Sequence, residues 1–477
     1  MILKFCALRA RVASTICLLL LSCAAYAAAG ARAQTASALF ISDTHFDPFH
    51  DPAKVKALAA APASEWETIL ASPDSPTQQQ DLDALRAVCA ERGPYDSYPL
   101  LKSALAAIRQ RAQGVRFVTV SGDLLAHKFF CRFAQTMPGA TPAEYEAFVE
   151  KTWQYQVDRL QQTLPHTPIY LALGNNDSNC DDNKLDTGTP FLAAVGGIVG
   201  RAAGSAWNAA AAKDFAAYGS YSVTMAAPMQ RTRLIVLNDN LLNNSYTHCS
   251  GQTDKAPGEQ QVQWLQQQLD AARKLHQRVW IMGHIPIGVN PYGTLSKGPT
   301  AVCHGRKPDM FLFSDALADT MAENAPEIQL ALFAHSHMDE LRLLGSGEKT
   351  LPVKFVPSIS PVNGNHPAFT VGVVDTATAT LADYTVYTAP DSLGSEWTKE
   401  YTWSTTYGQR GFTPATLRTV IDGFTADRAG ATPESKAYME NFTAGALGQL
   451  APFWPAYVCT MTNMHAVDYT ACVCGEK

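Results

Sequence analysis

Six short apolar runs, rich in β-branched residues, each end abruptly in Asp, Asn, Gly or His. Runs of this length and composition predict buried β-strands. Apolar residues at three-to-four spacing between them predict helices over 99–111, 144–164 and 259–275. Strands that alternate with helices indicate an α/β fold. The six runs cover residues 38–41, 115–120, 169–173, 234–237, 279–282 and 330–333.

Ligands in α/β folds collect beyond the carboxyl ends of the strands. We therefore expect the polar residues that follow the six runs to form one site, assembled from distant parts of the chain. Runs at 353–356, 369–374 and 381–387 predict further strands that complete a sheet, and the Gly- and Pro-rich segment 293–307 predicts a loop near the site. Helical spacing returns at 414–424 and 433–450.

The first 33 residues predict a secretory signal peptide. Lys4, Arg9 and Arg11 precede a short apolar run, and small residues lead to an A-x-A-like cleavage site. The protein is therefore expected to be secreted or periplasmic, without an integral membrane segment after cleavage. A membrane anchor and a lipid anchor on Cys23 are the alternatives. The expected organisation is a signal peptide at 1–33, a catalytic domain at 34–392 and a small helical C-terminal subdomain at 393–477.

Composition agrees with an exported globular protein. Of 477 residues, 47% are hydrophobic and 17% are charged, which is enough apolar content for a large core. The net charge of −6, without a basic run, argues against a nucleic-acid polymer as partner. An even number of cysteines beyond the signal peptide favours disulfides over a thiolate metal site, although the sequence does not choose a pairing. These cysteines are Cys89, Cys131, Cys180, Cys249, Cys303, Cys459, Cys472 and Cys474.

The residue types at the strand ends are those of a two-metal site. Hydrolysis of a phosphodiester needs a hydroxide nucleophile and neutralisation of the phosphoryl oxygens, and two nearby metals supply both by acting on a bridging water and on the phosphate. Such a pair requires a bridging carboxylate with several imidazoles or neutral oxygens. Singly, each motif also has a structural explanation; for example, Asn175 and Asp177 are typical caps of a turn. The candidate ligands are Asp43, His45, Asp123, Asn175, His284, His335 and His337.

In this order, D-x-H, G-D, G-N-x-D, G-H and x-H-x-H resemble the calcineurin-like metallophosphoesterase superfamily, most closely its acid sphingomyelinase-like phosphodiesterases. The resemblance spans about residues 38–475, and it implies two mixed β-sheets packed as a sandwich and flanked by helices. The narrower likeness is carried by segments 89–101, 122–127, 237–240, 284–288, 355–361 and 459–472.

The resemblance also implies a role for each ligand. One metal takes Asp43, His45 and His337, the other takes Asn175, His284 and His335, and Asp123 bridges the two. Zinc is the metal that it implies, whereas the ligand set alone also suits manganese or iron. His127 is implied to contact the substrate phosphate or the leaving group, and Asn238 and Asn240 are predicted to contact substrate.

One position departs from the family pattern. Where family members carry a His that protonates the leaving oxygen, this chain has Asn176. An amide can hydrogen-bond a phosphoryl oxygen, so Asn176 is still predicted as a catalytic and substrate-binding residue, but it has no proton to transfer at neutral pH. Three explanations are open: His127 protonates the leaving oxygen, the substrate has a good leaving group that needs no proton, or the protein has lost its catalytic activity. We adopt the first explanation as a hypothesis.

The expected activity is hydrolysis of a phosphodiester bond in a soluble small molecule, such as a nucleotide or a phosphocholine-type compound. A phosphomonoesterase with the same metal centre and a catalytically silent, metal-bound binding protein are the alternatives. The sequence gives no oligomeric state.

Overall fold

A computed structural model describes residues 34–347, 349–446 and 450–475. The predicted signal peptide and Cys23 lie outside the described residues. The chain divides into two compact units, Met1–Thr35 and Ala36–Lys477, and the second is described here. None of its described helices is both long enough and apolar enough to span a bilayer.

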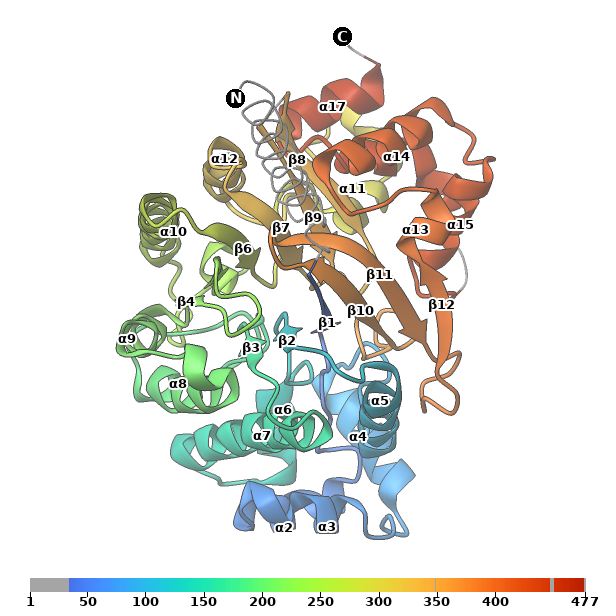
Figure 1. The fold of residues 1–477 in the computed structure, drawn as a ribbon. Coiled ribbons are helices and arrows are strands. Elements are labelled where there is room, and N and C mark those ends of the chain that lie inside the picture. Colours follow the sequence, from blue (N-terminus) through green and yellow to red (C-terminus); the bar gives the residue numbers. More distant parts are fainter. Residues whose placement is uncertain (1–33, 348, 447–449, 476–477) are drawn as a thin grey trace, which may run out of the picture. The chain divides into compact units, whose positions relative to one another are not determined.

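The first of two six-stranded sheets has the order β12-β11-β10-β1-β2-β3. Its strands β1, β2 and β3 are parallel, whereas β10, β11 and β12 pair antiparallel with one another (Figure 1). The bounds are β1 (Thr35–Ile41), β2 (Phe117–Val120), β3 (Ile169–Leu171), β10 (Ala368–Asp375), β11 (Thr380–Thr388) and β12 (Thr398–Thr402).

The second sheet has the order β4-β5-β6-β7-β9-β8. Strands β5, β6, β7 and β9 are parallel, and β4 and β8 close the two edges antiparallel. The bounds are β4 (Tyr221–Thr224), β5 (Thr232–Val236), β6 (Arg278–Met282), β7 (Ile328–Phe333), β8 (Leu341–Ser346) and β9 (Lys349–Phe355).

The two sheets pack face to face around aromatic side chains. Trp280 on β6 meets Phe40 and Phe117 of the first sheet edge to face, with ring centroids 6.1 Å and 5.6 Å away. All three are buried, and they belong to one core with residues of both sheets. The indole N–H of Trp280 donates to the carbonyl of Ala379, the last residue of the turn before β11, and this bond holds the ring in place. This confirms the predicted sandwich of two mixed sheets.

Helices cover the outer faces, as the apolar spacing predicts. α5 (Tyr98–Arg111) and α7 (Pro142–Thr163) pack on the first sheet, and α10 (Ala256–Lys274) and α12 (Ala316–Glu323) pack on the second. α7 begins at a capping box in which Thr141 and Glu144 satisfy each other's backbone N–H groups. The remaining α-helices are α2 (Val55–Ala60), α3 (Trp66–Leu70), α4 (Gln78–Cys89), α6 (Phe129–Thr136), α8 (Pro190–Ala203), α9 (Ala209–Tyr218), α11 (Pro291–Leu295), α13 (Trp403–Tyr407), α14 (Pro414–Ala426), α15 (Pro433–Asn441), α16 (Trp454–Thr460) and α17 (Ala466–Cys474).

The nine strands predicted from apolar runs are all present, and three further strands were missed. Strands β4, β8 and β12 carry polar residues within or beside their apolar positions, so their composition resembles a loop. The segment 293–307, predicted as a loop, contains the end of α11 and a short 3-10 helix, Ala301–His304. The predicted helix over 433–450 is too long, because α15 ends at Asn441 and Ala444 adopts a positive φ of 54°.

The predicted disulfides are confirmed, and the structure supplies their pairing. Two lie between residues 89 and 249. Of the other two, one joins α16 to α17 and one attaches α17 to the 3-10 helix at 301–304. The boundary at 392/393 stays a prediction. The pairs are Cys89–Cys131, Cys180–Cys249, Cys303–Cys474 and Cys459–Cys472.

Candidate metal centre

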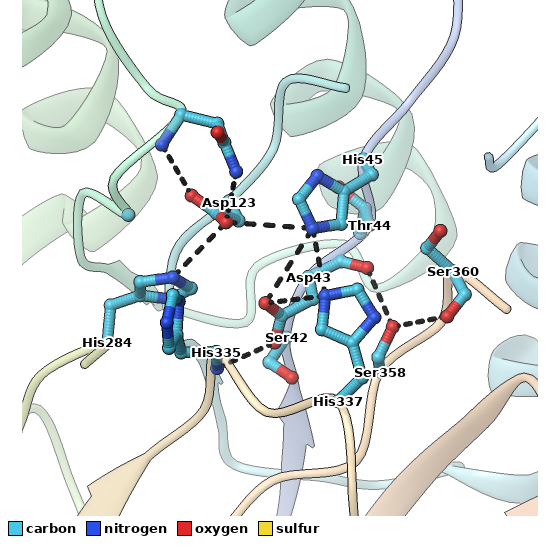
Figure 2. A network of polar contacts seen from close by, with 12 residues as sticks. Ser42, Asp43, Thr44, His45, Asp123, His284, His335, His337, Ser358 and Ser360 are labelled. Carbon is cyan, nitrogen blue, oxygen red and sulfur yellow. Dashed lines mark hydrogen bonds and ion pairs between the residues drawn. The ribbon is translucent and has the colours of Figure 1, made fainter. Parts of the chain in front are cut away.

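The predicted ligands lie on the loops that leave the carboxyl ends of the parallel strands, and several of them have unusual backbone conformations. Asp43, His45, Asp123, His335 and His337 all have positive φ, between 43° and 71°. Residues other than glycine rarely adopt this region, although Asn, Asp and His do so more often than the rest. Such conformations gather at functional sites, where the surrounding structure enforces them. Five strained residues from three loops converge in one place (Figure 2).

Asp43, His45 and His337 form the first group of possible ligands, with one donor atom from each lying within 4.8 Å of the others. Nε2 of His45 is 3.1 Å from Nε2 of His337 and 3.8 Å from Oδ1 of Asp43. Oδ1 of Asp43 is 3.4 Å from Nε2 of His337. All three side chains are buried.

Asp123, His284 and His335 form the second group, again within 4.8 Å. Nε2 of His284 is 3.2 Å from Oδ2 of Asp123 and 3.1 Å from Oδ1 of Asn175. The rings of His284 and His335 meet edge to face, 5.2 Å apart. The structure therefore places the ligands predicted for the second metal, including Asn175, close to one another.

Asp123 lies between the two groups. Its Oδ2 atom is 3.2 Å from His284 and 3.6 Å from Nε2 of His45 (Figure 2). A carboxylate that reaches imidazoles of both groups with the same oxygen is placed as a bridging ligand would be.

Hydrogen bonds to carbonyl groups set which nitrogen of each ring is available. Nδ1 of His45 lies 2.8 Å from the carbonyl oxygen of Leu125, and Nδ1 of His284 lies 2.8 Å from that of Ser121. These contacts leave Nε2 of each ring facing the site, where it can bind a metal ion once it carries no proton.

The donor atoms fit divalent cations. Lone-pair nitrogens and carboxylate oxygens crowd together, which is unfavourable unless a positive charge lies among them. Oδ1 of Asp43 and Nδ1 of His337 are buried without a hydrogen-bond partner among the described residues. Four imidazoles, two carboxylates and one amide suit zinc, manganese or iron.

The pKa values of these groups reflect the same crowding. Burial raises the pKa of Asp43 to about 7, against the attraction of His284. Burial opposes a charge on His284, but the charge and hydrogen bond of Asp123, together with the charges of Asp43 and Asp239, raise the pKa of His284 to about 10. Burial lowers the pKa of His335 to about 3, helped by the positive charge of His284. One proton on His284 thus supplies part of the positive charge that the oxygens require.

Two buried carboxylates that were not among the predicted site residues position this centre. Asp177 accepts hydrogen bonds from the backbone N–H groups of Asp123, Leu124, Leu125 and Gly174, at 2.8–3.2 Å. Asp239 accepts from the N–H groups of His284 and Ile285 at 2.8 Å and 3.0 Å. The turn-capping explanation of Asp177 is therefore right, and the turn that it caps carries the bridging carboxylate. Each acid lies within four residues of the end of a predicted strand, but the sequence does not show which backbone groups it meets.

Two glycines leave room for Asp123. A Cβ atom on Gly174 would lie 2.0 Å from Oδ1 of Asp123, and one on Gly122 would lie 2.7 Å from the backbone nitrogen of Gly174. Gly122 also has a φ of 88°. The G-D and G-N-x-D motifs thus need glycine because the two loops approach each other closely.

His127 lies beside the first group. Its ring stacks on His45 with centroids 4.4 Å apart, and it lines a pocket of about 270 Å³ that also reaches Asn175 and His335. Its Nδ1 atom has no hydrogen-bond partner among the described residues. Burial and the neighbouring His45 lower the pKa of His127 well below its usual value.

Asn176 occupies the position of the family histidine and is turned toward Asp123. Its side-chain amide donates to Oδ2 of Asp123 at 2.6 Å, and its backbone N–H donates to Oδ1 at 2.9 Å. Its Oδ1 atom is buried without a partner among the described residues. The residue lines the same pocket.

Asn238 and Asn240 do not line this pocket. Asn238 is fully buried, and its amide donates to the carbonyl of Tyr218 at 2.9 Å. Asn240 is buried too, and its Oδ1 lies 3.4 Å from the amide of Asn243. Both support the loop that carries Asp239, so their predicted contact with substrate has no geometric support here.

Comparison with known proteins agrees with this geometry. The family model described as calcineurin-like phosphoesterase matches residues 36–339. Human acid sphingomyelinase-like phosphodiesterase 3b is 24% identical over 472 residues, covering 93% of this chain and 91% of the relative. The cyclic GMP-AMP phosphodiesterase SMPDL3A of Rattus norvegicus is 23% identical over 395 residues, covering 79% of this chain and 81% of the relative.

Among solved structures, a dimetal phosphatase from Danio rerio has a TM-score of 0.40 at 13% identity, covering 76% of this chain and 98% of that one. The family match extends over most of the described catalytic region and includes all seven candidate ligands, from Asp43 to His337. The chain belongs to the calcineurin-like phosphoesterase family.

Proposed function

We propose that this protein hydrolyses phosphodiester bonds in soluble small molecules at a centre of two divalent metal ions. The observation that carries the proposal is the position of Asp123, whose Oδ2 lies 3.6 Å from His45 and 3.2 Å from His284. A shared carboxylate between two imidazole-rich groups is the arrangement that a dinuclear site requires. Relatives named as phosphodiesterases support the reaction class.

We assign Asp43, His45 and His337 to one ion and Asn175, His284 and His335 to the other, with Asp123 between them. Two bound ions lower the pKa of water and neutralise the phosphoryl oxygens. Zinc is our proposed metal, because the resemblance to the acid sphingomyelinase-like phosphodiesterases implies it; the ligand set by itself also suits manganese or iron.

The protein's own residues position the substrate. His127 lines the pocket next to His45, so a phosphate held at the centre lies within reach of its ring. We assign to His127 the transfer of a proton to the leaving oxygen, for which the negative charge of the bound phosphate must offset the burial that lowers the pKa of its ring. Asn176 is not placed to do so, because its amide donates to Asp123 and carries no acidic proton.

Export to an oxidising compartment is also proposed. The described residues contain four disulfides. Disulfides persist in secreted and periplasmic proteins and are rare in reducing compartments. A signal peptide over 1–33 is consistent with this proposal.

The test compares bis- and mono-nitrophenyl phosphate as substrates of the metal-loaded protein. A phosphodiesterase hydrolyses the diester faster, and Asp123→Asn removes this activity. Preference for the monoester would instead establish a phosphomonoesterase with the same centre.

A silent binding protein is a second candidate, favoured by Asn176 in place of the proton-donating histidine. Stoichiometric metal without turnover of either ester would establish that alternative and contradict our proposal.

A further inference from the structure

A loop beside the metal centre, residues 90–95, forms one wall of the pocket that contains His127. The loop follows α4, and it supplies Arg92 and Tyr95 to the lining. Tyr95 is 3% exposed, and its ring lies 5.6 Å from that of His127. Its hydroxyl proton has no acceptor among the described residues. The loop therefore presents polar groups to a ligand that extends past His127.

The loop 90–95 is firmly held. The disulfide Cys89–Cys131 ties its start to α6. The fully buried guanidinium of Arg132 contacts Glu91 and Asp47, at 2.8 Å each, and lies 5.2 Å from the centre of the Tyr95 ring. A fixed loop presents its side chains with little loss of entropy on binding.

Arg92 has an uncommitted positive charge. Its side chain is exposed at the pocket, and its guanidinium forms no ion pair with a carboxylate of the described residues. The adjacent Glu91 is held by Arg132 and Arg86. By contrast, Lys128, the other cation of the lining, lies 3.5 Å from Asp182.

The pocket as a whole favours an anion. Its lining holds two permanent cations, Arg92 and Lys128, and one carboxylate, Asp182, so these side chains sum to one positive charge. The other polar lining residues include six asparagines, whose amides are neutral donors and acceptors. A cationic group such as choline would meet repulsion here, whereas a second phosphate would be attracted.

We propose that Arg92 determines substrate specificity by binding a second phosphate group, beyond the phosphodiester that is cleaved. A guanidinium pairs with two phosphate oxygens at once, which a lysine does not reproduce. The inference rests on the proposed function and narrows it to phosphodiesters that carry further phosphate.

A matched pair of substrates tests the inference. The p-nitrophenyl ester of thymidine 5′-phosphate is compared with the same ester that carries a phosphate on its 3′-oxygen. The scissile bond and the leaving group are identical, so the ratio of the two kcat/KM values reports only the added phosphate. For the wild type we expect a ratio of about 10 or more, as for a charge-assisted hydrogen bond.

Arg92→Gln should bring the ratio close to one, and Arg92→Lys should give an intermediate value. Arg109→Gln is the control, because Arg109 is also an exposed arginine but lines a different groove. It should keep the wild-type ratio.

A wild-type ratio near one, or an Arg92→Gln variant that keeps the high ratio, overturns this inference and leaves the proposed function intact. Failure of the wild type to hydrolyse either ester overturns the proposed function and this inference with it.

Discussion

Asp177 accepts hydrogen bonds from the backbone of the loop that carries Asp123, and replacing its carboxylate tests whether these bonds hold Asp123 in position. Each of its two oxygens accepts two backbone N–H groups: Oδ2 those of Asp123 and Gly174, Oδ1 those of Leu124 and Leu125. In Asp177→Asn, one oxygen becomes an NH₂ group. Whichever oxygen is lost, two buried N–H donors then face another donor.

The magnitude follows from these two donors. A buried N–H without an acceptor costs about 1–3 kcal/mol, so the variant should lose roughly 2–6 kcal/mol of stability. The loss is concentrated at the loop that carries Asp123, so metal affinity should fall as well. Burial and the charge of Asp123 raise the pKa of Asp177 to about 7, so the folded protein binds this proton more tightly than the unfolded chain does, and the contribution of this group to stability falls as the pH rises through about 7.

Urea unfolding of the metal-loaded protein measures the stability, and metal content after dialysis measures retention. Asp181→Asn is the matched control, because Asp181 lies on the same loop but is partly exposed and pairs with Lys184 at 3.2 Å. Its change should stay below about 1 kcal/mol. Equal small effects of the two substitutions, with metal retained, would refute the reasoning.

Three further predictions concern the centre itself. Gly174→Ala should abolish metal retention, because its Cβ would lie 2.0 Å from Oδ1 of Asp123. The control Gly197→Ala lies in a helix and its Cβ would meet only a side-chain atom 3.7 Å away, so it should retain metal; retention by both variants would contradict this prediction. His127→Ala should slow hydrolysis of alkyl esters by ~10²–10⁴ and of nitrophenyl esters far less, since only a poor leaving group needs the proton; steady-state kinetics showing equal losses would reject the assignment. Because burial raises the pKa of Asp43 to about 7, protons compete with the metal below that pH, so zinc titration calorimetry should show affinity falling from about pH 8 to about pH 6, and a constant affinity would oppose this account.

Much of the fold could be predicted from the sequence because its central strands are strongly apolar. Buried strands such as β6 and β7 are nearly continuous hydrophobic runs, so their position follows from composition. Strand β12 (Thr398–Thr402), with the sequence TKEYT, has only one buried residue, so its pairing with β11 depends on tertiary contacts. Pairing of the cysteines likewise depends on the folded chain.

The ligands could be predicted because the carboxyl ends of parallel strands meet at one edge. The residues that position them could not, because their role depends on which backbone groups they meet. Asp239 lies between Asn238 and Asn240, and the sequence does not distinguish the acid that holds the His284 loop from the amides beside it. Equally, the sequence shows an amide at position 176 but not its contact with Asp123.

The central claim is that two metal ions share Asp123. Anomalous X-ray diffraction from crystals of the metal-loaded protein, recorded at the absorption edge of the bound metal, tests it most directly. We expect two peaks, one beside His45 and His337 and one beside His284 and His335, with the Asp123 carboxylate between them. A single peak, or two peaks that do not both contact Asp123, would contradict the account.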